Sequence, residues 1–194
     1  MLKVGITGGI GSGKSVVTRI FKTLGIPTLD ADSFAKDLMA HNVEVREQLT
    51  ANFGSSIFQY GHLDRQALSK IVFNDKAMLA QLNGIVHPAV KKYGNLWMEA
   101  QNAAYVVKEA ALFFESGSDK DMDIIIGVSA PENLRLARAM QRDNATEADV
   151  RKRMSNQMDE AEKMLHCDYI IFNDEQHSII EQVVHLHQLF LKQA

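Results

Sequence analysis

Cysteine is nearly absent from this sequence of 194 residues, which contains only Cys167. A single cysteine excludes a disulfide framework within the chain and a metal site built from several cysteines. Long apolar runs are also missing, since none approaches the roughly 18 consecutive apolar residues of a membrane-spanning helix. The opening MLKVGITGG reaches glycines before any signal-peptide core could form. We therefore expect a soluble, cytoplasmic protein that does not interact with membranes.

An excess of positive charge is missing too. Lys and Arg number 21 against 24 Asp and Glu, which gives a formal net charge of −3. General nucleic-acid binding lacks its electrostatic footprint, so we expect no nucleic-acid partner. The seven histidines show no metal-ligand spacing such as H-E-x-x-H. The length suits one sizeable α/β domain, as a monomer or a small homo-oligomer.

Short apolar runs alternate with segments of helical periodicity along the chain. This alternation predicts a parallel β-sheet covered by helices on both faces. Expected strands are 2–6, 26–29, 105–110, 123–128 and 168–172. Expected helices are 14–24, one or two in 33–53, 64–102 with a break at His87-Pro88, 131–141 with Pro131 at its first position, 146–156 capped by Thr146, and 175–192.

The glycine-rich stretch GGIGSGKS, residues 8–15, fits the phosphate-binding pattern G-x-x-x-x-G-K-[ST]. Glycines let the backbone approach a ligand closely, and successive N–H groups then form an anion site at the start of a helix. The pattern places Lys14 on the β- and γ-phosphates and Ser15 on Mg²⁺. We predict that ATP is bound by Gly8, Gly9, Gly11, Ser12, Gly13, Lys14, Ser15 and Val16.

The phosphate loop by itself leaves open a small-molecule kinase, a GTPase switch and a transport ATPase. The guanine-reading N-K-x-D and D-x-x-G patterns of a switch do not occur, nor does an L-S-G-G-Q-like transporter signature. A kinase needs an acceptor site beside the γ-phosphate and cations that neutralise the transferred charge. Candidates for both are present, which favours the kinase.

The acceptor candidate is DAD, residues 30–32, at the end of the second expected strand. Ligands of open α/β sheets bind at the carboxyl ends of strands, the edge that also carries the phosphate loop. A carboxylate there can accept the proton of a substrate hydroxyl. We assign this role to Asp32. Asp30 either lies near the metal or has a structural role. Either aspartate could instead cap a helix that begins near Ser33.

The cationic candidates follow the fourth expected strand. Arg135, Arg138 and Arg142 share one helix face, and further arginines follow on the next helix. The polar connection RDNATEAD between these helices is typical of a lid that closes over phosphates. We predict Arg142 as the lid residue that acts in catalysis, although charged helix residues often form only a solvated face.

Seven segments in this order resemble the dephospho-CoA kinase family: TGGIGSGKS, DADSFAKDL, LDRQALSKIVF, LNGIVHPAV, LFFESG, RDNATEADVRKRMSNQ and DYIIFND. The resemblance implies a P-loop NTPase fold with a five-stranded parallel sheet. Its core would be residues 1–32, 103–137 and 157–194, with a helical substrate-binding region at 33–102 and a lid at 138–156. It also implies transfer of the γ-phosphoryl group of ATP·Mg²⁺ to the ribose 3′-hydroxyl of dephospho-CoA, activated by Asp32, which completes coenzyme A.

The resemblance adds candidate substrate residues in the middle of the chain. Arg65 would contact an acidic group of the substrate. His87 is either a substrate contact or, with Pro88, the entry of a helix. Glu115 could serve the substrate or the metal. Asn173 would approach the adenine of ATP or is an ordinary turn residue.

The segment KEAALFFE, residues 108–115, departs from the commonest pattern of the family. Ala111 replaces a proline, and Glu109 stands where an aspartate is frequent. Glu109 could hold Mg²⁺ through water, although its side chain is longer. Two other functions stay open: a kinase for another small hydroxyl substrate, such as a nucleoside monophosphate or a sugar acid, and a nucleotide-dependent regulatory module.

Overall fold

The computed structural model describes residues 1–73 and 75–193. The chain divides into two compact units: unit 1 is Met1–Asp30 with Gln101–Ala194, and unit 2 is Ala31–Ala100. Among the described residues, none of the helices combines the length and the apolar character needed to span a bilayer.

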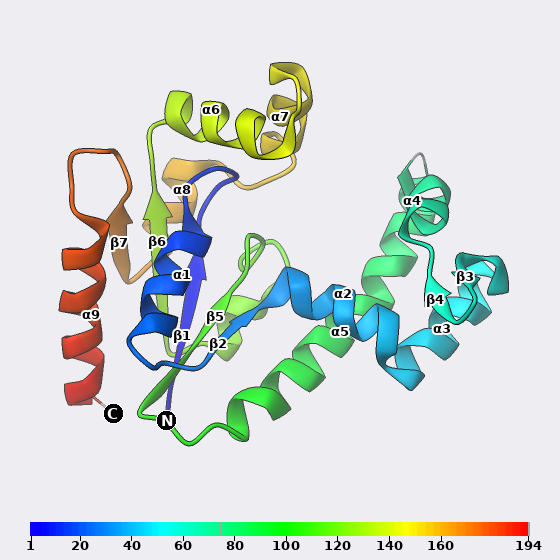
Figure 1. Cartoon of the computed structure of the whole chain (residues 1–194), viewed down its shortest axis with the longest axis horizontal. Helices are drawn as coiled ribbons and strands as arrows, with labels where there is room; N and C mark the ends of the chain where they lie inside the picture. Colours follow the sequence, from blue (N-terminus) through cyan, green and yellow to red (C-terminus); the bar gives the residue numbers. More distant parts are fainter. Residues whose placement is uncertain (74, 194) are drawn as a thin grey trace. The chain divides into compact units, whose positions relative to one another are not determined.

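Unit 1 is built on a five-stranded sheet whose neighbours are all parallel, in the order β2-β5-β1-β6-β7 (Figure 1). The strands are β1 (Leu2–Thr7), β2 (Thr28–Asp30), β5 (Tyr105–Glu109), β6 (Ile124–Ser129) and β7 (Tyr169–Phe172). All five expected strands are confirmed within a few residues. Their β-branched runs are buried in β1, β5 and β6, as expected of strands with covered faces.

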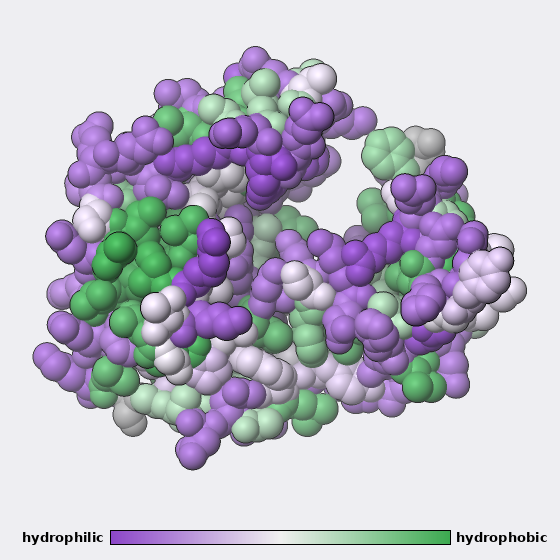
Figure 2. Space-filling view, viewed as in Figure 1, coloured by the Kyte–Doolittle hydropathy of each residue, from purple (hydrophilic) through white to green (hydrophobic). Residues whose placement is uncertain are grey.

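The helices of unit 1 are α1 (Lys14–Thr23), α6 (Glu132–Asp143), α7 (Glu147–Met154), α8 (Glu160–Leu165) and α9 (Ile179–Gln193), with a 3₁₀ turn, η2 (Ser118–Asp121). α1 and α9 bury their apolar faces together against β1 and β5, with Phe21 and Phe190 fully buried beside Tyr105. Figure 2 shows apolar side chains gathered over these two helices. α9 begins four residues later than expected, and α8 was not expected at all.

α6 and α7 have a small core of their own, formed by Leu136, Ala139 and Val150. Ile10 of the phosphate loop packs against this core. Thr146 caps α7 by accepting a hydrogen bond of 3.2 Å from the amide of Asp149, so the expected cap is confirmed. Pro131 precedes α6 as its N-cap and is not its first residue.

Unit 2 is helical around a separate core. Its helices are α2 (Ala31–His41), α3 (Val43–Phe53), α4 (Arg65–Phe73) and α5 (Lys76–Glu99), with a 3₁₀ turn, η1 (Ser55–Ile57), and a short hairpin of β3 (Phe58–Gln59) and β4 (His62–Leu63). Asn42 separates α2 from α3, because its side chain accepts a hydrogen bond from the amide of Val45 and so caps α3. The hairpin was not expected from the sequence.

Pro88 lies inside α5, so the expected break at this position was wrong. Proline has no N–H, and the helix therefore lacks the hydrogen bond to the carbonyl of Gly84. The helix continues because residues on both sides of the proline pack into the core of unit 2, Ile85 before it and Val90 after it. Burial of this face outweighs one missing hydrogen bond. The interpretation of His87-Pro88 as a helix entry was wrong for the same reason.

Candidate active site

The phosphate loop, residues 8–13, connects the end of β1 to the start of α1. Gly13 takes a left-handed conformation, with φ of 97°, directly before the first residue of α1. A Cβ at this position would overlap the side-chain amide nitrogen of Asn173. Only glycine therefore fits the turn without strain or displacement. The N-terminus of α1 therefore borders this loop, and helix N-termini favour bound anions.

Lys14 folds back over the loop that precedes it. Its ammonium donates hydrogen bonds of 2.9 Å to the carbonyl oxygen of Gly8 and 3.1 Å to that of Gly9. Ser15 and Val16 follow on the exposed side of the first turn, whereas Ser12 is fully buried. The ammonium thus lies against the first two residues of the loop, and the phosphate-binding pattern uses this lysine as the cation for phosphates.

The carboxyl edge of the sheet brings Asp30 and Glu109 alongside the phosphate loop. These two residues are register partners at the ends of β2 and β5, and Glu109 is also the partner of Ile6 in β1. Mg²⁺ binds oxygen ligands and often uses one or two side chains together with substrate phosphates. The hydroxyl of Ser15 and the carboxylate of Glu109 fit such a donor set. No group of three or more His, Cys, Asp or Glu side chains suited to a metal occurs among residues 1–73 and 75–193.

Three predicted substrate residues belong to unit 2. Asp32 is the second residue of α2, two positions after the end of β2, so it is not the residue that caps this helix. Arg65 is the first residue of α4, and His87 lies inside α5; both are exposed. Their contacts with a substrate stay predictions.

Asn173 directly follows β7 and is 9% exposed. Its side-chain amide donates a hydrogen bond of 2.7 Å to the carbonyl oxygen of Ser12. The guanidinium of Arg138 donates in turn to the carbonyl oxygen of Asn173 at 3.0 Å. The structure thus gives Asn173 a contact with the phosphate loop, and a contact with adenine stays a prediction.

Glu115 is engaged by a lysine that sequence reasoning did not single out. Lys163, whose side chain is fully buried, donates 2.9 Å and 3.0 Å hydrogen bonds to the carbonyl oxygen of Ala111 and to Glu115 Oε1. The amide of Met158 also donates to Glu115 Oε1. Burial raises the pKa of Glu115, but the hydrogen bonds from Met158 and Lys163 outweigh it and hold this pKa below its ordinary value. Glu115 is therefore a carboxylate that joins the segment after β5 to the start of α8.

The arginines of α6 make different contacts although they share the helix. Arg135 is buried, whereas Arg142 is exposed and forms a bidentate pair with Asp143 at 2.7 Å and 2.9 Å. Arg153 of α7 donates to the same carboxylate at 2.8 Å. Hydrogen bonds from Arg142 and Arg153 hold the pKa of Asp143 well below its ordinary range. Asp143 thus joins two cations of the expected lid segment.

The sequence patterns did not single out three residues that contact this region, Gln157, Glu160 and Lys163, although Gln157 is the last residue of the segment RDNATEADVRKRMSNQ that resembles the family. Each is of a type that is usually solvated, and α8, which carries two of them, was not expected. Spacing along the chain does not reveal them, because their partners lie 48 to 151 residues away.

Comparisons with known proteins agree on one family. The family model described as Dephospho-CoA kinase matches residues 2–178. A curated dephospho-CoA kinase of Porphyromonas gingivalis is 41% identical over 187 residues, 96% of this chain and 93% of the relative. A crystal structure from Thermus thermophilus has a TM-score of 0.85 at 31% identity and covers 97% of this chain and 96% of its own. The structure of a dephospho-CoA kinase from Campylobacter jejuni has a TM-score of 0.69 at 28% identity and covers 98% of this chain and 97% of its own. The chain therefore belongs to the dephospho-CoA kinase family, a family of ATP-dependent P-loop kinases.

Proposed function

We propose that this protein transfers the γ-phosphoryl group of ATP to the ribose 3′-hydroxyl of dephospho-CoA, which yields coenzyme A and ADP. The observation that carries the proposal is the phosphate loop between β1 and α1, with Gly13 in the left-handed conformation and the Lys14 ammonium against its first two residues. Membership of the dephospho-CoA kinase family supports the choice of acceptor.

In this proposal the loop amides and the N-terminus of α1 hold the phosphates of ATP. Lys14 leaves the carbonyl oxygens of Gly8 and Gly9 and pairs with the β- and γ-phosphates. This exchange is favourable because a phosphate carries full negative charge, whereas a carbonyl oxygen carries only a partial one.

Ser15 and Glu109 would hold Mg²⁺, Ser15 directly and Glu109 through water. The ion would supply positive charge that neutralises the negative charge developing on the phosphates during transfer. Glu109 is at the end of β5 beside β1, and Asp30 is its register partner, so both carboxylates lie at the carboxyl edge of the sheet where we place the metal.

The helical unit 2 would bind dephospho-CoA, with Arg65 and His87 as contacts. Asp32 orients the 3′-hydroxyl and accepts its proton as the oxygen attacks the γ-phosphorus. The position of Asp32 two residues after the end of β2 supports this role, since parallel sheets carry their ligands at the carboxyl ends of the strands.

Residues 138–156 would act as the lid that excludes water, whose attack on the γ-phosphorus would waste ATP. Arg142 is the residue that we expect on the transferred phosphate. Asp143 holds it beside Arg153, so the lid presents two cations together. We also propose that the enzyme acts in the cytoplasm as a monomer or a small homo-oligomer, which size-exclusion chromatography with light scattering would test.

The first experiment incubates dephospho-CoA with ATP, Mg²⁺ and the purified protein and analyses the product by mass spectrometry. We expect one added phosphoryl group on the ribose 3′-oxygen. Lys14→Ala should abolish this product, whereas Lys22→Ala, an exposed lysine on the same helix, should retain it. No product from a protein that binds ATP would overturn the proposed acceptor, and nucleotides and sugar acids would be tested next.

A second experiment addresses Asp32. Asp32→Asn should lower kcat by two to four orders of magnitude, about the range of general-base catalysis, with ATP affinity almost unchanged. Asp37→Asn, an exposed aspartate on the same helix, is the matched control. A near wild-type kcat for Asp32→Asn would show that the catalytic role was assigned to the wrong residue, and Asp30→Asn would then be measured.

A further inference from the structure

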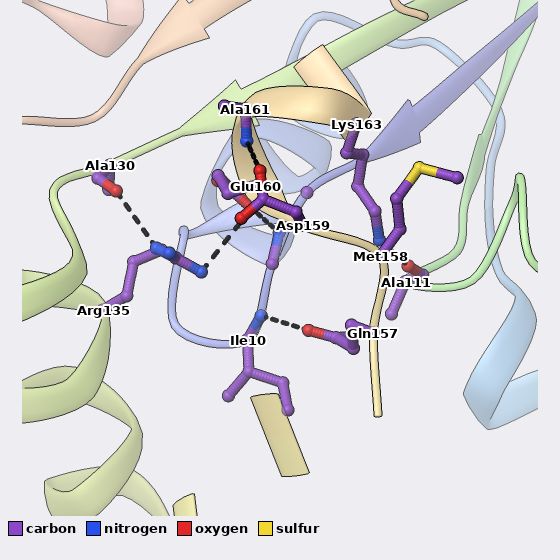
Figure 3. A network of polar contacts seen from close by, with 12 residues as sticks. Ile10, Ala111, Ala130, Arg135, Gln157, Met158, Asp159, Glu160, Ala161 and Lys163 are labelled. Carbon is purple, nitrogen blue, oxygen red and sulfur yellow. Dashed lines mark hydrogen bonds and ion pairs between the residues drawn. The ribbon is translucent and has the colours of Figure 1, made fainter. Parts of the chain in front are cut away.

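The segment that follows the expected lid is hydrogen-bonded to the phosphate loop. The amide of Gly9 donates a hydrogen bond of 2.9 Å to Glu160 Oε2, and the next amide, that of Ile10, donates one of 2.9 Å to Gln157 Oε1. Figure 3 shows Gln157 reaching the Ile10 amide and Glu160 lying at the start of α8. Two successive loop N–H groups therefore have side-chain acceptors that lie 147 and 151 residues later in the chain.

Arg135 of α6 completes this arrangement. Its Nε donates to the carbonyl oxygen of Ala130 at 3.1 Å, and its Nη1 lies 3.5 Å from Glu160 Oε2 (Figure 3). The side chains of Arg135 and Glu160 are only 10% and 15% exposed. A single oxygen of the Glu160 carboxylate thus accepts a hydrogen bond from the Gly9 amide and also forms an ion pair with the buried guanidinium of Arg135.

The fit of these groups against the loop is close. A Cβ at Gly9 would meet the Arg135 guanidinium and lie 2.5 Å from Glu160 Oε2, and a Cβ at Gly11 would overlap the backbone of Arg135. Ile10 packs its side chain into the small core of α6 and α7. The first half of the loop is therefore sandwiched between α6 and the start of α8.

These contacts lie at the two ends of the expected lid. Arg135 precedes residues 138–156, and Gln157 follows them. Glu115, which follows β5, holds the segment after the expected lid in place, because it accepts hydrogen bonds from both Lys163 and the amide of Met158. The expected lid is therefore bounded on both sides by residues that contact the phosphate loop, Arg135 before it and Gln157 after it.

We propose that Glu160 is a positioning residue for ATP, which acts through the Gly9 amide to keep the phosphate loop in its binding shape. Gln157 supports it at the Ile10 amide. The inference rests on the proposed function only in that ATP is the nucleotide bound. A free Gly9 N–H would let the loop relax, and its inward-facing amides would no longer converge on the phosphates.

The test compares the dissociation constant for ATP, measured calorimetrically without acceptor, with the melting temperature of each variant. Glu160→Ala should weaken ATP binding about tenfold, the effect expected when a hydrogen bond that shapes a site is lost. Glu160→Gln keeps an oxygen for the Gly9 amide and should stay within about threefold of the wild type. Glu162→Gln, an exposed glutamate on the same helix, is the matched control and should bind as the wild type does.

A double variant separates positioning from stability. Glu160→Ala leaves Arg135 buried without its carboxylate, which should lower the melting temperature. Arg135→Met combined with Glu160→Ala removes that unpaired charge, so the melting temperature should rise again while ATP binding stays weak. If ATP affinity instead recovers together with the melting temperature, Glu160 serves stability alone and the proposal is wrong.

Gln157→Ala removes the second acceptor without leaving a charge unpaired, so it tests the same loop in a variant that should fold. We expect weaker ATP binding, with the Michaelis constant for ATP raised several-fold and that for dephospho-CoA almost unchanged. Wild-type ATP affinity in both Gln157→Ala and Glu160→Ala would overturn the proposal. Absence of dephospho-CoA turnover in the wild type would count against the proposed function alone, because the ATP dissociation constants do not depend on the acceptor.

Discussion

The side-chain amide of Asn173 donates a hydrogen bond of 2.7 Å to the carbonyl oxygen of Ser12 and so joins the end of β7 to the phosphate loop, 161 residues earlier in the chain. The backbone amide of Asn173 donates to the carbonyl oxygen of Ser129 at 2.8 Å, which fixes the residue at the edge of the sheet. The same side chain fills the space that a Cβ on Gly13 would need. The shape of the loop therefore depends on a residue far away in sequence.

Asn173→Ala should weaken the binding of ATP and of inorganic tripolyphosphate equally, by about tenfold, because the carbonyl of Ser12 loses its donor. Calorimetry with each ligand measures both effects, and Asn133→Ala, at an exposed position of α6, is the control. A loss confined to ATP would instead indicate that Asn173 contacts the adenine, as the resemblance to the family implies.

Gly13→Ala should abolish ATP binding, whereas Gly25→Ala at the other end of α1 should not. Both glycines have positive φ, 97° and 84°, so each substitution costs about 1–2 kcal/mol of conformational strain. Open space surrounds Gly25 in the described structure, but a Cβ at Gly13 also displaces Asn173. Equal ATP affinities of the two variants would contradict the close contact between Gly13 and Asn173.

Glu115→Gln should destabilise the protein at neutral pH by about 1–3 kcal/mol, because the buried Lys163 loses a charged acceptor. The pKa of Glu115 is lowered in the folded state, so its contribution is complete above the unfolded pKa of about 4.3 and is lost as the pH falls through the lower, folded value. Urea unfolding from pH 7 to pH 3 should therefore show a difference between wild type and variant that shrinks below about pH 4.

The control for this measurement is Glu181→Gln on α9, an exposed glutamate, for which no such pH dependence is expected. A stability difference for Glu115→Gln that stayed constant across the pH range would mean that the carboxylate charge does not stabilise Lys163.

Pro88→Ala should stabilise the protein by about 1–2 kcal/mol, because it returns an N–H to the interior of α5 for the carbonyl of Gly84. Pro131→Ala is the matched control, since Pro131 precedes its helix and no internal hydrogen bond is restored there. Thermal and urea unfolding measure both variants. A lower melting temperature for Pro88→Ala would imply that the proline ring contributes packing that outweighs the missing hydrogen bond.

Much of unit 1 was predictable, because local patterns specify it. Five strands rich in β-branched residues alternate with helices. In the loop GGIGSGKS the glycines permit the tight backbone turn, and Lys14 supplies the cation. The cap at Thr146 is likewise local, since its partner is three residues away. Unit 2 was less predictable. Its hairpin is only two residues per strand, and α5 runs through Pro88 because of packing that no window of sequence contains.

The sequence by itself determined which residues could hold phosphate, since positive φ and a following lysine are properties of the loop alone. Only the tertiary structure decided what keeps that loop in shape. Asn173 reaches Ser12, Glu160 reaches Gly9, and Gln157 reaches Ile10 across 147 to 161 residues of chain. Polar side chains of this kind are usually solvated, and a hydrogen bond to a distant backbone group depends on where folding places both partners. The physical reason is that secondary-structure propensity depends on a few neighbouring residues, whereas the burial of a side chain and its hydrogen-bond partners depend on the fold of the whole unit.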